Sequence, residues 1–431
     1  MKKTDVFEGD CLNRQCPPDY ENNVRCRFFG MGSDGRQLTV PFTDDILGRH
    51  LLFLGGIGTG KTNALLQIIR QIRLSLTEND VAVIFDTKGD FYNEFYKPGD
   101  IVISNDNKAT GDNGANFWNI IGEINKGEHE EESVLEIAKT LFKEKVENSS
   151  QPFFPNAAKD LFTALLLHAV RNGDVRSNHA LRQMLDSCDI AEIQRILSCH
   201  QDLKAMTSYI SDAKSPQTQG VLSELQQMTR EIFIGNFRKK GTLSMRDLVQ
   251  KKGGKVIFIE YDLGIGNALT PIYRLLVDLA IKESLSRSKS EGNVWFVADE
   301  FRLLPQLQHM EDAVNFGRSL GVKFLVGIQN VDQIYDSYGE SKAKSIMSGF
   351  LTNVIFRVND HTSREYARNL FGQNRKMDVY SSAIHAKGIT EQLRDANVVE
   401  DWDITRLGIG EAIIGLPGKE PFVFQFKKYE T

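Results

Sequence analysis

The stretch Gly55-Gly56-Ile57-Gly58-Thr59-Gly60-Lys61-Thr62 matches the phosphate-binding pattern G-x-x-x-x-G-K-[ST] at every fixed position. A short apolar run at residues 51–54 precedes it and predicts a buried strand, and an amphipathic pattern from Asn63 onward predicts a helix. This order of strand, loop and helix directs backbone N–H groups and the positive end of a helix at phosphate oxygens. The stretch therefore predicts an α/β protein that binds a nucleoside triphosphate.

The composition of this loop assigns a role to each part of it. Glycines let the backbone curl around phosphates, Lys61 is expected to neutralise the β- and γ-phosphates, and the Thr62 hydroxyl is expected to ligate Mg²⁺. The residues predicted to contact the nucleotide are Gly55, Gly56, Gly58, Thr59, Gly60, Lys61 and Thr62. The alternative, a glycine-rich turn that carries Lys-Thr by chance, is disfavoured by the predicted strand and helix on either side.

A second candidate element is the apolar run at residues 294–298, which ends in Asp299-Glu300. We expect Asp299 to complete the Mg²⁺ shell and Glu300 to polarise the attacking water. Such a run also fits a strand that simply leaves into solvent, but the phosphate-binding loop favours the functional interpretation. Asp86 follows an earlier strand-like run and competes for the metal role. We interpret it as part of a strand-end loop near the nucleotide, because Asp299 and Glu300 supply both roles side by side.

Two later side chains are candidates for completing the site. Arg318 lies between glycines after a predicted helix, where an arginine could reach the nucleotide of a neighbouring subunit. Gln329 ends the apolar run 324–328, where a carboxamide could sense the γ-phosphate or position water. A solvated arginine at a helix end and a polar strand cap are the alternatives, and the residues alone leave both open.

Length and composition describe an ordinary globular protein with 431 residues, 41% hydrophobic and 25% charged residues, and a formal net charge of −5. This net negative charge argues against a protein surface that is basic throughout, so any contact with DNA must be local.

No apolar run approaches the roughly 20 residues needed to span a bilayer, and the polar N-terminus lacks the apolar core of a signal peptide. With five cysteines, an odd number, these features predict a cytoplasmic protein. We expect Cys11, Cys16 and Cys26 to be free thiols rather than a metal cluster.

Strand-like and helical patterns alternate along most of the chain, which is typical of a mostly parallel sheet covered by helices. The strand-like runs are 81–85, 256–261, 294–298, 324–328, 354–358, 412–416 and 422–426. The strand signal disappears between Glu130 and about Phe237, where helical spacing predicts an inserted all-α domain. The expected organisation is a lead-in with strands at 1–45, a nucleotide-binding domain in two parts at 46–129 and 238–431, and the insertion at 130–237.

Taken together, these motifs resemble the TraG/TraD-like coupling ATPases of type IV secretion and conjugation, which are related to the FtsK/HerA DNA translocases. The resemblance runs from about Arg49 to the C-terminus. It is carried by the P-loop with the preceding His50-Leu51-Leu52-Phe53-Leu54, Asp86-x-Lys88-Gly89-Asp90, Asn116-Phe117-Trp118-Asn119, Pro152-Phe153-Phe154, Asp299-Glu300-Phe301, Gly317-Arg318-Ser319, the run from Gln329 to Gly339, and Gly410-Glu411-Ala412-Ile413-Ile414.

The resemblance implies a RecA-like P-loop ATPase with ATP and Mg²⁺ as ligands. It also implies a hexameric ring of identical subunits that hydrolyses ATP at subunit interfaces and translocates DNA or a DNA–protein substrate. Arg318 matches the arginine finger that acts on a neighbouring subunit, and Gln329 matches the glutamine at the following strand end. The all-α insertion then recruits partners such as a relaxase or another protein substrate.

This sequence departs from typical members, which carry N-terminal transmembrane helices. A membrane-anchoring or secretion-system partner could hold it at the inner membrane, or it could be a soluble DNA motor of a mobile element or a defence system. A function of a different class is a nucleotide-dependent switch or assembly scaffold, which DNA-stimulated ATP turnover would distinguish from a motor. For DNA contact we interpret the basic clusters Arg238-Lys239-Lys240 and Arg375-Lys376 as solvated loops, with a nucleic-acid contact as the alternative.

Overall fold

The computed structural model describes residues 2–18, 21–32, 35–105, 116–125, 127, 129–285, 291–381 and 389–430. The chain forms two compact units. The first consists of Met1–Thr77, Glu291–Pro305 and Glu311–Thr431, and the second of Glu78–Ser290 and Gln306–Met310. These bounds differ from those expected from the sequence, since the second unit includes strands as well as the helical block. The four-part division with an insertion at 130–237 stays a prediction.

The sheet of the first unit is built around β4 (Leu51–Leu54), the strand that leads into the phosphate-binding loop. Strand β4 lies between β9 and β10 and is parallel to both. On the far side of β9, β8 is also parallel. On the far side of β10, β13 and then β14 pair in antiparallel orientation. The bounds are β8 Val294–Ala298, β9 Val322–Ile328, β10 Thr352–Phe356, β13 Glu411–Gly415 and β14 Phe422–Gln425. Every residue of β4, β8, β9 and β10 is buried, as expected for parallel strands covered on both faces.

Helix α2 (Lys61–Ser75) starts directly at the end of the phosphate-binding loop. Its glutamines bind the edge of the two-stranded sheet β2 (Val24–Met31) and β3 (Gln37–Thr43). Gln67 accepts a hydrogen bond of 2.8 Å from the Phe29 N–H, and Gln71 accepts one of 2.9 Å from the Arg27 N–H. The other helices of this unit are α1 Asp44–Leu47, α11 Met310–Phe316, α12 Asp332–Tyr338, α13 Glu340–Ser348, α14 His361–Phe371 and α15 Asp401–Thr405.

A separate three-stranded antiparallel sheet joins β1 (Lys2–Glu8), β11 (Gln373–Ser381) and β12 (Ile389–Asn397). The loop interpretation of Arg375-Lys376 is therefore wrong, since both residues lie in β11. Arg375 is 3.4 Å from a carboxylate oxygen of Glu8 and of Asp395, so its charge is balanced within this sheet.

The second unit contains a parallel sheet in which β7 (Lys255–Glu260) lies between β5 (Val81–Asp86) and β6 (Ile101–Ser104). Helices α3 (Asp90–Phe95), α9 (Met245–Lys251) and α10 (Gly266–Leu285) follow or precede these strands. The fold class predicted from the sequence, α/β with a mostly parallel sheet, is confirmed. No helix in the described part of the chain has the length and apolar character needed to cross a membrane.

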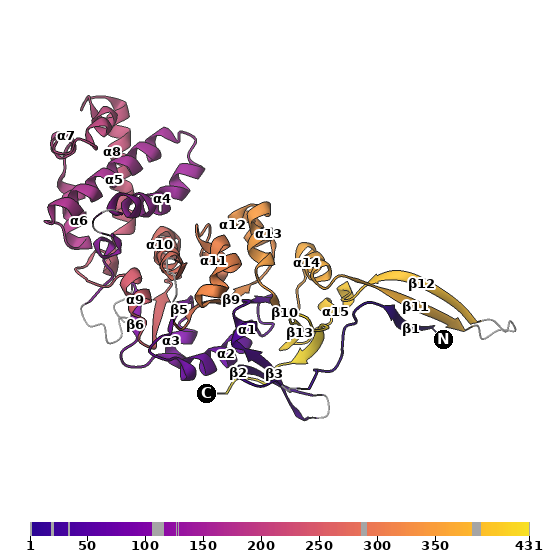
Figure 1. Cartoon of the computed structure of the whole chain (residues 1–431). Helices are drawn as coiled ribbons and strands as arrows, with labels where there is room; N and C mark the ends of the chain where they lie inside the picture. The colour runs from indigo at the N-terminus through magenta and orange to yellow at the C-terminus, as the bar shows by residue number, and fades with distance from the viewer. Residues whose placement is uncertain are drawn as a thin grey trace. The chain divides into compact units, whose positions relative to one another are not determined.

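Helices α4 to α8 of the second unit pack on one another (Figure 1). Their bounds are α4 Glu130–Asn148, α5 Phe153–Asn172, α6 Asn178–Ser187, α7 Ile190–Ser198 and α8 Pro216–Ile232. The described residues from 129 to 238 contain no strand. Helix α5 is central, because twelve of its side chains are buried, and Phe162 packs on Phe142 of α4 at 5.6 Å between ring centroids.

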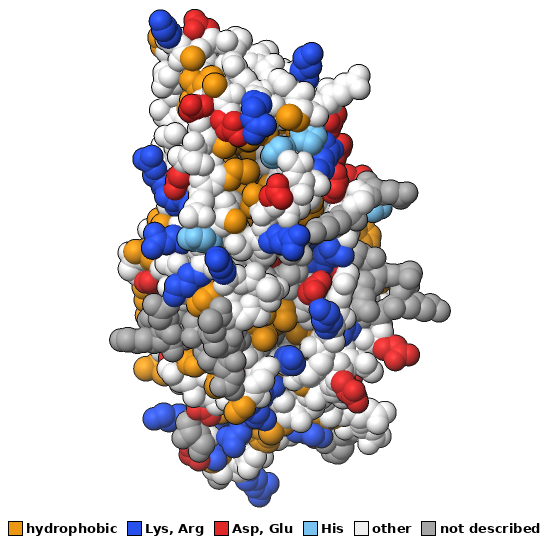
Figure 2. Space-filling view, turned by 90° about the vertical axis from the view of Figure 1, so that its left-hand side faces the viewer, with side chains coloured by type: hydrophobic (Ala, Val, Ile, Leu, Met, Phe, Trp, Pro, Cys, Tyr) orange, Lys and Arg blue, Asp and Glu red, His pale blue; other side chains and the backbone are white. Residues whose placement is uncertain are grey.

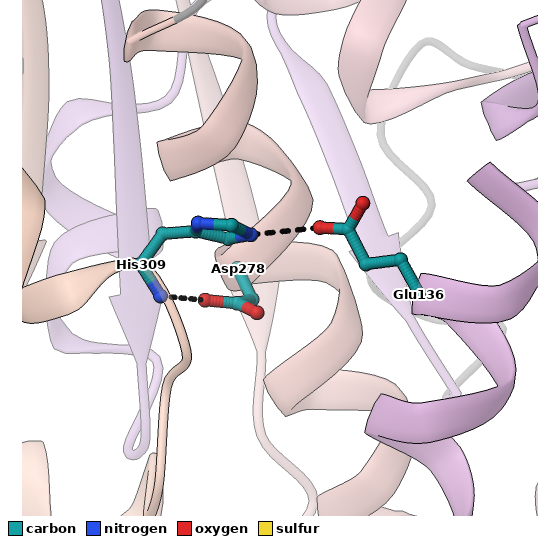
Figure 3. Close-up of side chains that lie close together, drawn as sticks. All are labelled: Glu136, Asp278 and His309. Atoms are coloured by element: carbon teal, nitrogen blue, oxygen red, sulfur yellow. Dashed lines mark hydrogen bonds and ion pairs between the residues drawn. The ribbon is translucent and has the colours of Figure 1, made fainter. Parts of the chain in front are cut away.

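A cluster of charged side chains joins α4, α10 and the short segment 306–310 within this unit (Figure 3). His309 Nε2 lies 2.7 Å from Glu136 Oε1, and the His309 backbone N–H donates a 3.0 Å hydrogen bond to Asp278. Glu, Asp and His are metal-ligand types, but the Lys282 ammonium already pairs with the other oxygen of Glu136. We therefore interpret the cluster as a partly buried network of hydrogen bonds and ion pairs.

Candidate nucleotide-binding site

The phosphate-binding loop adopts a conformation that requires glycine at two positions. Gly58 and Gly60 have φ angles of 72° and 117°, in the left-handed region that other residues rarely adopt. A Cβ atom on Gly60 would also lie 3.0 Å from the Gly410 Cα. The start of the loop is held by hydrogen bonds from Gly55 N to the Ile328 carbonyl (3.2 Å) and from Gly56 N to the Arg357 carbonyl (3.0 Å).

The Lys61 side chain bends back over this loop. It is only 8% exposed, and its ammonium donates hydrogen bonds to the carbonyls of Gly55 and Gly56, the latter at 3.1 Å. The Thr59 hydroxyl donates to the same Gly56 carbonyl at 2.8 Å. These contacts hold the Lys61 ammonium against the backbone of the loop. Lys61 also begins α2, where backbone N–H groups lack partners within the helix.

The loop and the strand-end acids predicted from the sequence meet directly. Thr62 Oγ1 donates a 2.7 Å hydrogen bond to Asp299 Oδ2. Asp299 directly follows β8 and packs against Gly327 of the neighbouring β9. Any larger residue at position 327 would clash, because its Cβ would lie only 2.4 Å from the Asp299 carbonyl oxygen. Two adjacent ligands of an octahedral Mg²⁺ lie about 2.9 Å apart, given its bond lengths of about 2.0–2.1 Å. The hydroxyl and the carboxylate therefore fit the spacing that Mg²⁺ requires.

Glu300 and Gln329 also meet, at the carboxyl ends of the adjacent parallel strands β8 and β9. Gln329 Nε2 donates a hydrogen bond to Glu300 Oε2. The other carboxylate oxygen, Oε1, lies 3.2 Å from the Arg302 Nε. The Glu300 side chain is mostly buried, at 15% exposure, and the hydrogen bond from Gln329 orients its carboxylate.

Arg318 lies apart from these contacts. It belongs to the short 3₁₀ turn Gly317–Leu320 after α11, and its guanidinium pairs with Asp45 of α1. Both side chains are half-exposed, at 51% and 53%. The structure thus brings Thr62 to Asp299 and Gln329 to Glu300, and it places Arg318 at the surface of its own subunit.

Asp86, in the second unit, stabilises a turn of the backbone. Its carboxylate accepts hydrogen bonds of 2.8–3.2 Å from the backbone N–H groups of Lys88, Gly89, Phe91 and Tyr92, which shapes the turn into α3. Burial raises the pKa of Asp86 above its ordinary value although these hydrogen bonds lower it. Burial and the charge of Asp86 together raise the pKa of the neighbouring Glu260 to about 8.

Two site residues were missed by the sequence reasoning. Arg302 contacts Glu300, but one arginine after an acidic pair gives no signal in a single sequence. Gly410 donates from its backbone N to the Thr59 carbonyl at 2.9 Å, so the C-terminal segment borders the loop. The run from Gly410 to Ile414 is one of the motifs that carry the family resemblance. Its glycine just before a predicted strand is the sequence signal that could have indicated a close contact with the loop.

Comparison with known proteins identifies the family and the fold of this chain. A family model described as "Type IV secretion-system coupling protein DNA-binding domain" matches residues 37–423. The coupling protein TraD of Escherichia coli (strain K12) is 23% identical over 417 residues, which cover 93% of this chain and 56% of TraD. The chain thus spans about half the length of this curated relative.

Solved structures of the conjugative coupling protein TrwB share the fold. Its unbound monoclinic form has a TM-score of 0.76 at 19% identity, with 93% of this chain and 89% of that chain covered. TrwB in complex with ADP and Mg²⁺ has a TM-score of 0.70 at 20% identity, with the same coverage of 93% and 89%.

Proposed function

Because the chain belongs to the type IV secretion-system coupling protein DNA-binding domain family, we propose that it couples ATP hydrolysis to the movement of DNA or a DNA–protein substrate. The observation that carries this proposal is the 2.7 Å contact between Thr62 Oγ1 and Asp299 Oδ2. It joins a phosphate-binding loop to an acidic strand end 237 positions away, which is the arrangement that nucleotide hydrolysis requires.

In this proposal the loop from Gly55 to Thr62 holds the phosphates of ATP. Its backbone N–H groups and the start of α2 face the phosphate oxygens, and the Lys61 ammonium exchanges the loop carbonyls for the β- and γ-phosphates. Thr62 and Asp299 hold Mg²⁺, which neutralises phosphate charge when bound. The relative TrwB has been solved with ADP and Mg²⁺, which supports this choice of ligands.

Glu300 acts as the general base that orients and deprotonates the attacking water. Gln329 holds one of its carboxylate oxygens, so a shift of Gln329 toward the γ-phosphate would reorient the base. Arg302 lies beside the other oxygen, with its Nε at 3.2 Å. The position of Glu300 would therefore depend on whether a γ-phosphate is present to attract Gln329.

The same proposal places Arg318 at the nucleotide of an adjacent subunit in a ring of identical subunits. Its half-exposed guanidinium is held by one exposed carboxylate, Asp45, from which it can separate at little cost. The helical block 130–237 is the part that selects cargo, such as a relaxase or another protein substrate. A membrane-associated secretion-system partner would hold the ring at the inner membrane.

DNA-stimulated ATP hydrolysis tests this function. A motor that moves along DNA should hydrolyse ATP faster when DNA is added, whereas a nucleotide-dependent switch should not. Release of phosphate by the purified chain is measured with and without single-stranded and duplex DNA. ATP hydrolysis that DNA leaves unchanged, under conditions where the chain binds DNA, would refute translocation and favour a switch or scaffold.

A further inference from the structure

A basic hollow lies in the second unit between α6 and the segment that follows the 3₁₀ turn Gly235–Arg238. Its volume is about 540 Å³, and it is lined by His179, Arg182, Gln183, Asp186, Arg238, Lys239 and Lys240. Four cations and one carboxylate give this lining a net charge of +3, in a chain whose net charge is −5. Figure 2 faces this side of the molecule and shows Lys and Arg side chains gathered around a histidine.

The backbone that carries the basic residues is held on both sides. On the N-terminal side, the buried Asn236 donates a 2.9 Å hydrogen bond to the Ser104 carbonyl. On the C-terminal side, Gly241 packs so closely that a Cβ there would lie 1.9 Å from the Phe117 carbonyl oxygen. The Leu243 N–H donates to that same oxygen at 3.0 Å. The backbone of the run 238–240 is therefore anchored at both ends, while Arg238 and Lys240 are exposed, as expected for a solvated loop.

A single asparagine joins the two walls of the hollow. Asn178, at the start of α6, is fully buried. It donates to the carbonyls of Trp118 (2.9 Å) and Phe237 (2.8 Å) and accepts from the Ile120 N–H (2.8 Å). Because Phe237 directly precedes Arg238, these bonds set the distance between α6 and the basic segment.

The basic side chains divide into two groups by their contacts. Arg182 donates to the Thr229 and Phe233 carbonyls at the end of α8 and pairs with Asp186, so it forms part of the wall. Lys239 has an extended backbone (φ −79°, ψ 165°) and its ammonium lies 4.7 Å from the centre of the Phe117 ring. Arg238 and Lys240 on either side of it are exposed, and both line the hollow.

We propose that this hollow binds the phosphodiester backbone of DNA, with Arg238 and Lys240 contacting phosphates. The inference rests on the proposed function, because it identifies where the second unit holds the DNA that the ATPase moves. A fixed, concave surface with a net positive charge fits a chain of phosphates, and lysine and arginine contacts of this kind release counterions. The contacts involve the backbone alone, so we expect binding without preference for base sequence.

The test is DNA binding by the full chain, measured by fluorescence anisotropy of a labelled single strand and of a duplex of the same sequence. The variant is Arg238→Gln/Lys240→Gln. The matched control is Arg195→Gln/Lys251→Gln, which removes one Arg and one Lys from exposed sites of the same unit, where Arg195 pairs with Glu192 and Lys251 with Asp247. A charge-retaining variant, Arg238→Lys/Lys240→Arg, shows whether charge or shape matters.

Loss of two phosphate contacts should weaken binding about 20-fold near 0.15 M salt, where each contact contributes roughly four- to sixfold. The slope of log K against log salt should become shallower by about 1.4 for the single strand and about 1.8 for the duplex. The control and the charge-retaining variant should bind like the wild type. ATP turnover without DNA should be the same in all of them, because these residues are remote from the phosphate-binding loop in the sequence and belong to the other unit.

Three outcomes would overturn the inference. Equal DNA affinity of the Arg238→Gln/Lys240→Gln variant and the control would remove the hollow from the DNA path while leaving the proposed function intact. Poly-glutamate is measured in the same assay as a competitor of the labelled DNA. If it displaces DNA from the wild type, and the Arg238→Gln/Lys240→Gln variant loses this competition but retains its DNA affinity, the hollow binds an acidic protein substrate instead. A wild-type chain that neither binds DNA nor responds to it in ATP hydrolysis would refute the proposed function, and the inference with it.

Discussion

Replacement of Arg318 by alanine should have a small effect on folding and a large effect on ATP turnover. In the folded subunit the guanidinium pairs with Asp45, and both side chains are about half-exposed. Pairs of this kind contribute about 0.2–1 kcal/mol to stability, so Arg318→Ala should remain folded and bind ATP. If Arg318 stabilises the transferring phosphoryl group of a neighbouring subunit, turnover should fall by a factor of about 10³–10⁵, or about 4–7 kcal/mol.

Asp45→Ala provides the matched control, because it breaks the same ion pair and leaves the arginine in place. We expect it to retain turnover. An experiment with mixed variants then shows whether Arg318 acts on the nucleotide of its own subunit or on that of a neighbouring subunit. Lys61→Ala cannot hold the phosphates but still offers Arg318 to its neighbour, so mixing it with Arg318→Ala should restore part of the activity. Subunit exchange is verified by native mass spectrometry of the mixture.

Exchange without recovered turnover would contradict action across an interface. Equal loss of turnover in Asp45→Ala and Arg318→Ala would show that the ion pair itself, and not the free arginine, is needed. Either result would remove the main support for hydrolysis at the subunit interfaces of a ring.

Other parts of the structure lead to further measurable expectations. Glu300→Gln should bind ATP and lose turnover, because the amide cannot accept a proton, whereas Lys61→Ala should lose binding, as measured by nucleotide titration and phosphate release. Asn178→Ala should lower the free energy of unfolding by about 3–5 kcal/mol, since it leaves a buried N–H and two carbonyls without partners, and a loss below 1 kcal/mol in urea titration would refute that role. Burial lowers the pKa of His309, but its contacts with Glu136 and Asp278 outweigh this and hold the pKa above 6.5. The stabilisation from protonated His309 should thus be complete below about pH 6.5 and disappear at higher pH, so His309→Gln should cost more stability at pH 6 than at pH 9.

Much of the nucleotide site could be predicted because its parts follow general rules. Parallel strands end at the same edge of a sheet, so an acid pair after one strand and a glutamine after another were expected to lie near the P-loop. The direct bond between Gln329 and Glu300 was not predicted, because strand order cannot be read from one sequence. The sequence predicts Gln329 near the γ-phosphate or the attacking water, whereas in the structure its amide contacts the Glu300 carboxylate.

The strands β11 and β12 were missed for a physical reason. Strand prediction relies on apolar residues at alternate positions, but two buried positions of β11 are Asn374 and Asp378. These side chains find partners in the fold, since Asp378 pairs with Arg394 at 3.0 Å and Asn374 donates to the Asp10 carbonyl at 2.8 Å. Buried polar side chains whose partners lie far away in the sequence do not produce the local hydrophobic periodicity on which strand prediction relies.

The pairing of β4 has a consequence for the order in which a ribosome can assemble this protein. Both neighbours of Leu51–Leu54 come from far downstream, β9 beginning at Val322 and β10 at Thr352. Roughly 270 residues must be synthesised after β4 before its first partner exists, which takes about 13–54 s at about 5–20 residues per second. During that interval an apolar strand and the glycine loop behind it have no sheet to join. We therefore expect the nascent chain to be most prone to aggregation in this segment, and slower synthesis of the residues between β4 and β9 would prolong that exposure.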